Sequence, residues 1–110
     1  MSFGKAATLD ELWIGEKLAV VVAGRPVLLV NVDGTVFAYE DRCRHKGMAL
    51  SLGKLEGHVL TCSVHGWNYD ARTGAGINPS SAQLSRFPVK IEGNDILVDV
   101  AELEGHGNSA

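Results

Sequence analysis

Apolar residues recur at every second position near the end of the chain and gather in short runs nearer its start. Residues 87–91 and 96–100 each place apolar side chains at alternate positions, and Gly93-Asn94 lies between them. A period of two places these side chains on one face of a strand. The pattern therefore predicts an antiparallel hairpin with one buried face.

The first half of the chain is also typical of β-structure. Residues 18–23 and 27–32 are rich in β-branched side chains and are separated by Gly24-Arg25-Pro26. Asp33-Gly34 then leads into residues 35–39, and an Asp-Gly pair between apolar segments is a strong hairpin signal. We therefore expect strands joined by tight turns over this part of the chain.

The middle of the chain predicts a second group of short strands. Lys54–Glu56 and residues 59–62 form a hairpin pattern around Gly57, and Asn68–Asp70 predicts one more strand. Residues 74–85 hold Gly or Pro at three of twelve positions, which is typical of a loop.

A capping-box pattern stands near the N-terminus, with Thr8 as the N-cap and Glu11 three positions later. It predicts a short helical turn that runs through about Trp13 and closes near Gly15. We expect Trp13 to be a core anchor, because large aromatic side chains contribute most when they are buried.

These patterns together predict an all-β protein, an antiparallel β-sandwich with no long helix and no domain linker. We expect a single domain over residues 1–110. Residues 1–40 and 81–104 would form a base sandwich, residues 41–80 an inserted subdomain, and residues 105–110 a flexible tail.

Composition and charge exclude several classes of partner. The chain is 45% hydrophobic and carries a formal net charge of −3, so no basic stripe favours nucleic acid. No apolar run approaches the roughly 18 residues of a membrane-spanning helix, and the N-terminus lacks the pattern of an export signal. We expect a cytoplasmic protein with no membrane partner, whose thiols stay reduced.

Two cysteines and two histidines are concentrated in two short fragments. Cys43-Arg44-His45 is followed, after sixteen residues, by Cys62-Ser63-Val64-His65, and these fragments contain both cysteines of the chain. A disulfide would leave both histidines without a role. A Cys–His nucleophile pair would need an orienting group that the sequence does not reveal. The concentration of ligand types therefore favours a metal centre.

Two kinds of metal centre use these ligands. A structural zinc site takes Cys and His in a tetrahedral set, although common zinc modules place Cys with Cys and His with His. A two-iron cluster can have two Cys on one iron and two His on the other. The cluster explains why each fragment has Cys before His, and we favour it over zinc.

The two fragments resemble the Rieske iron–sulfur motif, Cys-x-His followed by Cys-x-x-His. The chain as a whole looks like the Rieske ferredoxin component of bacterial toluene monooxygenases. That likeness is carried by Met1-Ser2-Phe3, Leu9-Asp10, Trp13, Gly15-Glu16, Gly66-Trp67-Asn68-Tyr69-Asp70 and Gly76-Ile77-Asn78-Pro79.

The resemblance implies a Rieske fold with one [2Fe-2S] cluster per chain. It also implies an electron carrier that is not itself an enzyme, and we expect this carrier to be a monomer. Such a carrier takes single electrons from an NADH-dependent ferredoxin reductase and passes them to a di-iron hydroxylase that acts on an aromatic hydrocarbon. By the same resemblance, Cys43 and Cys62 would bind the buried iron, and His45 and His65 the outer iron.

Residues around the ligands bear on the reduction potential. Trp67 stands where respiratory Rieske proteins carry a Ser, and their two additional cysteines are absent from this sequence. Fewer donors to sulfur predict a low potential, toward about −150 mV. Tyr69 retains a Tyr that donates a hydrogen bond in those proteins, although a purely structural role in the core is equally compatible. We expect Trp67 to shield the cluster from water.

Further residues of the predicted loops have expected roles. Gly47 and Gly66 would permit tight turns, and Pro79 would belong to the loop that covers the cluster. Arg44 and Lys46 make the first fragment basic, which predicts steering toward an acidic recess on a partner. An ordinary solvated face is the alternative interpretation of those charges.

Three other functions remain open. The motif alone does not separate a monooxygenase ferredoxin from the ferredoxin of an aromatic-ring dioxygenase, although the terminal likenesses favour the monooxygenase. A small subunit of a nitrite reductase would carry the same motif. A zinc-stabilised binding module would have no redox role.

Overall fold

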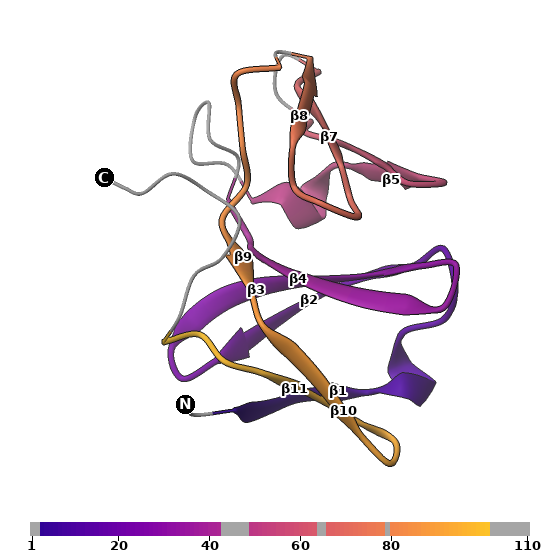
Figure 1. Ribbon diagram of the computed structural model, residues 1–110, viewed down its shortest axis with the longest axis vertical. Helices are drawn as coiled ribbons and strands as arrows, with labels where there is room; N and C mark the ends of the chain where they lie inside the picture. The colour runs from indigo at the N-terminus through magenta and orange to yellow at the C-terminus, as the bar shows by residue number, and fades with distance from the viewer. Residues whose placement is uncertain (1–2, 43–48, 64–65, 79, 102–110) are drawn as a thin grey trace.

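The computed structural model describes residues 3–42, 49–63, 66–78 and 80–101, and it is built from antiparallel β-sheets. Figure 1 shows two sheets together in the lower part of the molecule and a third sheet above them. The all-β fold class predicted from the sequence is confirmed. No helix within the described ranges is long and apolar enough to cross a membrane.

The first sheet joins the start of the chain to its end. Its strands, in spatial order, are β1 (Gly4–Thr8), β11 (Asp95–Val98) and β10 (Val89–Glu92). β10 and β11 form the hairpin predicted around Gly93-Asn94. β1 is not predicted by the sequence pattern, because its residues have little β-propensity and the strand is defined by its pairing with β11.

The second sheet contains the predicted strands of the first half of the chain. Its spatial order is β2 (Lys17–Val22), β3 (Arg25–Val32), β4 (Thr35–Glu40) and β9 (Arg86–Phe87). Asp33 and Gly34 have φ of 54° and 94° between β3 and β4. Positive φ at both positions is what a tight hairpin turn of type I′ requires, and it explains the Asp-Gly pair.

β3 is buried on both faces and separates two hydrophobic cores. Val27 and Leu29 lie in the core between the first two sheets. Leu28 and Val30 lie in a second core, which the third sheet closes from the other side. This double burial explains why the strand is an unbroken apolar run instead of an alternating one.

The third sheet follows the order β5 (Lys54–Glu56), β6 (Val59–Thr61), β7 (Asn68–Asp70) and β8 (Gly76–Asn78). The expectation of a loop throughout residues 74–85 is therefore wrong. β8 forms because its backbone pairs with β7, with Gly76 opposite Tyr69. A short strand that begins with Gly is set by its neighbour and not by its own pattern.

The N-terminal helical turn is shorter than predicted. It is a 3-10 turn, η1 (Leu9–Glu11), and the N–H of Thr8 donates to the Glu11 carboxylate at 2.9 Å, as a capping box requires. The prediction that Trp13 is a core anchor is wrong, since this residue is 69% exposed. Leu12, which is 1% exposed, takes the core position instead.

Candidate metal centre

The second ligand fragment lies in the loop between β6 and β7. Thr61 and Asn68 are paired at the ends of these strands. The N–H of Cys62 donates to the carbonyl of Trp67 at 2.7 Å, so the loop is closed at its base. Gly66 has a φ of 67°, a conformation that favours glycine. His65 belongs to this loop but lies outside the described residues.

Cys62 is buried at the inner end of the loop, with 1% exposure. It belongs to the second core together with Leu50, Leu60 and Tyr69. A thiolate in such surroundings is costly unless a cation compensates its charge. A buried iron would supply that compensation, so the environment of Cys62 fits an inner cluster ligand.

The first ligand fragment leaves the end of β4 and returns at a second 3-10 turn, η2 (Leu50–Leu52). Asp41 ties the two ends together, because its carboxylate accepts hydrogen bonds from the Ser51 N–H at 2.8 Å and the Ser51 hydroxyl at 2.7 Å. The ammonium of Lys17 also donates to the Ser51 carbonyl. The predicted residues of this fragment lie outside the described part of the chain: Cys43, Arg44, His45, Lys46 and Gly47.

The two fragments meet where the first ends and the second begins. Lys54 is paired with Thr61 across β5 and β6. Gly53 lies so close to Thr61 that an added Cβ would collide with the Thr61 carbonyl oxygen. Cys62 follows directly, so the return of the first loop and the start of the second are adjacent in space. This is the arrangement that a centre with ligands from both loops needs.

The neighbouring aromatic residues contact the same core as Cys62. Tyr69 is fully buried in the second core, and Trp67 is partly buried against that core. The burial of Tyr69 agrees with both of its predicted roles. Pro79 lies outside the described residues.

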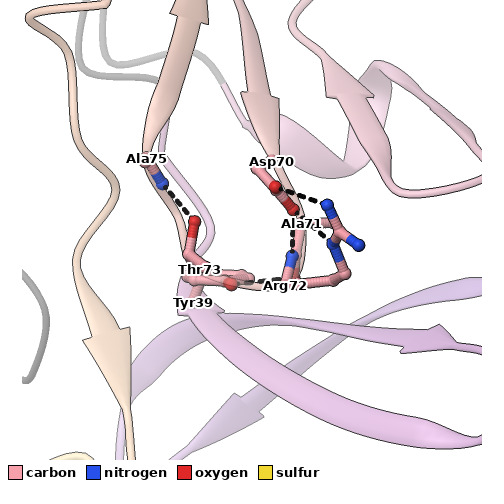
Figure 2. A network of polar contacts seen from close by, with 6 residues as sticks. All are labelled: Tyr39, Asp70, Ala71, Arg72, Thr73 and Ala75. Carbon is pink, nitrogen blue, oxygen red and sulfur yellow. Dashed lines mark hydrogen bonds and ion pairs between the residues drawn. The ribbon is translucent and has the colours of Figure 1, made fainter.

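A polar network fixes the turn that follows β7 (Figure 2). The buried hydroxyl of Tyr39 donates to the Ala71 carbonyl at 2.8 Å. Gly74 lies against the Tyr39 ring, since a Cβ there would come within 2.9 Å of the ring. Burial raises the pKa of Tyr39, so its hydroxyl remains a donor across the physiological range.

Asp70 and Arg72 form the outer part of this network. One carboxylate oxygen of Asp70 accepts from the Arg72 backbone N–H at 2.9 Å and from Nε at 3.0 Å, and the other accepts from Nη2 at 2.9 Å. This hydrogen bonding by the guanidinium lowers the pKa of Asp70. The pair therefore stays ionised and braces the turn at neutral pH.

The ligand assignment to Cys43, His45, Cys62 and His65 stays a prediction, with Cys62 the member that the structure describes. Sequence reasoning missed the residues that shape the loop bases. Asp41 and Ser51 give only the weak signal of polar residues that flank a ligand fragment. Gly53 and Tyr39 give no signal at all, because their roles depend on contacts between distant segments.

Comparisons with known proteins agree on one family. The model of the Rieske [2Fe-2S] domain matches residues 2–88. The biphenyl dioxygenase ferredoxin subunit of Pseudomonas sp. (strain KKS102) is 40% identical over 96% of this chain and 99% of its own length. The alkene monooxygenase ferredoxin component of Xanthobacter autotrophicus is 37% identical over 92% of this chain and 84% of its own length.

Solved structures give the same result for the fold. The ferredoxin of carbazole 1,9a-dioxygenase from Nocardioides aromaticivorans IC177 superposes with a TM-score of 0.81 at 30% identity, covering 89% of this chain and 97% of that one. A ferredoxin in a complex of reduced oxygenase and oxidised ferredoxin of carbazole 1,9a-dioxygenase superposes with a TM-score of 0.80 at 28% identity, covering 87% and 91%.

Proposed function

This chain belongs to the Rieske [2Fe-2S] domain family, and we propose that it serves a multicomponent monooxygenase of toluene or a related aromatic hydrocarbon. It is a ferredoxin of the oxygenase-system type, an electron-transfer component and not an enzyme, and it carries a Rieske-type [2Fe-2S] cluster. In the proposed system it takes one electron at a time from an NADH-dependent reductase. It passes each electron to a di-iron hydroxylase.

The observation that carries the proposal is the contact between the end of the first loop, at Gly53, and the start of the second loop, at Thr61. Cys43 and Cys62 would hold the inner iron, and His45 and His65 the outer one. When bound, the cluster supplies one-electron redox chemistry. The chain supplies the enclosure, because the core around Cys62 keeps water from its sulfur.

The test of the cluster is chemical. The purified protein should contain iron and acid-labile sulfide in equal amounts and show a visible spectrum that dithionite bleaches. Replacing Cys62 with Ala should abolish both the colour and the bound iron. A colourless protein that contains zinc would overturn the proposal in favour of a zinc-stabilised module.

The choice of a di-iron hydroxylase rests on the terminal likenesses of the sequence, such as Met1-Ser2-Phe3 and Leu9-Asp10. An aromatic-ring dioxygenase is the second candidate, because one relative with 40% identity is a biphenyl dioxygenase ferredoxin subunit. A reconstituted assay separates the two. The protein should sustain NADH-dependent turnover of a purified di-iron toluene hydroxylase and not of a biphenyl dioxygenase, and the opposite preference would favour the second candidate.

We propose that Arg44 and Lys46 steer the cluster end toward an acidic recess on a partner. Reversing both charges to Glu should slow electron transfer at low salt, and added salt should no longer slow it as it slows the wild type. Unchanged salt dependence would leave these residues as an ordinary solvated face. We also propose a cytoplasmic location, where thiols stay reduced, and a monomer, which sedimentation of the holoprotein checks.

A further inference from the structure

A groove with an exposed apolar wall lies on the base of the molecule. It has a volume of about 390 Å³ and is lined by Leu9, Leu12, Trp13, Ile14 and Asn31. Trp13 and Ile14 are 69% and 68% exposed. Large side chains exposed side by side in this way are typical of interaction sites, whereas single exposed apolar residues are common on any surface. We call this feature the Trp13 groove.

Asn31, a buried residue of β3, lines the Trp13 groove and fixes the neighbouring segment through hydrogen bonds. Its amide nitrogen donates to the Leu12 carbonyl at 3.0 Å, and its amide oxygen accepts from the Gly34 N–H at 2.9 Å. Its backbone carbonyl accepts from Gly15 at 2.8 Å, and its N–H donates to Glu16 at 3.0 Å. The segment that carries Trp13 is therefore fixed to the central strand.

The Trp13 side chain is itself held in its exposed position. Its indole N–H donates to the Asp10 carbonyl at 2.9 Å, and its backbone N–H donates to the Glu16 carboxylate at 3.0 Å. A side chain that is already ordered loses little rotamer freedom on binding. Rigid, exposed Trp residues are among the commonest anchors of protein interfaces.

The charge around the groove selects the kind of partner. Asp10, Glu11 and Glu16 lie within the same short segment, and residues 6–16 contain no Lys or Arg. A second copy of the chain would bring acidic groups against acidic groups in a two-fold contact, which is unfavourable. The complementary surface is an apolar side chain flanked by Lys or Arg.

The groove is remote from the loops of the candidate metal centre. In Figure 1 the turn that follows β1 lies beside the lower sheets, whereas β7 and β8 lie at the opposite end of the molecule. The longest extent of the chain is 37 Å. A protein that receives electrons at the cluster end and also contacts the groove must therefore extend along the side of the ferredoxin.

We propose that the Trp13 groove is a second docking surface for the terminal oxygenase, which in the proposed system is the di-iron hydroxylase. The oxygenase inserts an apolar side chain flanked by basic residues. This rests on the proposed function, and a related ferredoxin has been captured in complex with its oxygenase. Contact at the groove slows dissociation of the ferredoxin from the oxygenase, while electrons leave the ferredoxin at the cluster end.

The test compares two double variants of the holoprotein. Trp13→Ser with Ile14→Ser removes the wall of the groove, and Val21→Ser with Ile91→Ser is the matched control at exposed apolar positions outside it. Calorimetric titration of the oxidised protein with the purified oxygenase should show at least a tenfold weaker Kd for the groove variant alone. The visible spectrum and the rate of reduction by the reductase should be unchanged. Raising NaCl from 0.05 to 0.5 M should weaken wild-type binding, and Asp10→Asn should reduce that dependence.

Several results would overturn the inference. These are equal Kd values for the two double variants, weakened binding to the reductase instead of the oxygenase, or a wild-type dimer that the groove variant dissociates. Failure of the proposed function is recognised separately, because a wild-type protein without a cluster, or without electron transfer to any oxygenase, fails before the groove is tested.

Discussion

The hydroxyl of Tyr39 donates a buried hydrogen bond of 2.8 Å to the carbonyl oxygen of Ala71. Tyr39 belongs to β4 of the second sheet, and Ala71 follows β7 of the third. This bond joins the base of the molecule to the sheet that carries the second ligand loop. It is a directional link within the second core, whose other contacts are largely apolar.

Replacing Tyr39 with Phe should destabilise the protein by about 1–2 kcal/mol, because the Ala71 carbonyl is left buried and without its donor. The expected fall in Tm is roughly 5–10 °C for a domain of this size. Thermal unfolding followed by circular dichroism measures it. A variant that unfolds at the wild-type temperature would show that water or another donor replaces the hydroxyl.

The same residue predicts a loss of stability at high pH. Burial raises the pKa of Tyr39 in the folded protein, whereas an unfolded Tyr ionises near pH 10. Above about pH 10 the unfolded state releases this proton and the folded state keeps it, so stability falls as the pH rises. Urea unfolding between pH 9 and 11 should show a steeper loss for the wild type than for Tyr39→Phe. Parallel slopes would contradict the prediction.

The Asp70–Arg72 pair predicts the opposite dependence at low pH. The pKa of Asp70 is lowered chiefly by the side-chain hydrogen bonds from Arg72, so the pair stabilises the fold above the ordinary pKa of 3.8 and loses this effect as the pH falls. In Arg72→Gln the pKa should rise toward 3.8, which an NMR titration of the carboxyl measures. Lys90→Gln, which breaks the exposed pair with Glu92, is the control and should leave the pKa of Asp70 unchanged.

The elements that could be predicted from the sequence are those that are encoded locally. The Asp33-Gly34 turn and the hairpin around Gly93-Asn94 are encoded by residues that are close in the chain, and both were predicted correctly. β1 and β8 were missed because each exists through pairing with a partner strand. For β1 that partner, β11, comes from the far end of the chain.

The direction in which a side chain points could not be predicted from the sequence either. The size of Trp13 suggested burial, but the short turn η1 directs Leu12 inward and leaves Trp13 on the surface. In the candidate metal centre, the ligand set inferred from the close pairing of Cys and His stays a prediction. The closures by Asp41–Ser51 and Gly53–Thr61 could not be predicted, because they depend on how two loops approach each other.

The contact between Gly53 and Thr61 predicts that the junction of the loops tolerates no side chain. In Gly53→Ala the added methyl collides with the Thr61 carbonyl, and relieving the collision should cost about 1–3 kcal/mol. Because Cys62 follows Thr61, the displacement should also lower the iron content per chain, measured colorimetrically after reconstitution.

Gly57→Ala is the matched control for that experiment. Gly57 has a φ of 61° with open space around it, so the substitution strains the backbone at a turn without a collision. It should lower Tm but leave the iron content at the wild-type level. Equal iron content in both variants would show that the junction does not position Cys62.

The last prediction separates the two roles of Tyr69. This residue is fully buried and shares the second core with Cys62. If its hydroxyl donates to the cluster, it stabilises the reduced state, and Tyr69→Phe should lower the reduction potential. A hydrogen bond with a net contribution of about 1 kcal/mol corresponds to roughly 40 mV for a one-electron couple. Protein-film voltammetry at pH 7 measures the shift. Tyr39→Phe is the control, because the Tyr39 hydroxyl donates to the Ala71 carbonyl. This variant should leave the reduction potential unchanged. An unchanged potential in Tyr69→Phe, together with a lower Tm, would assign Tyr69 to the core alone.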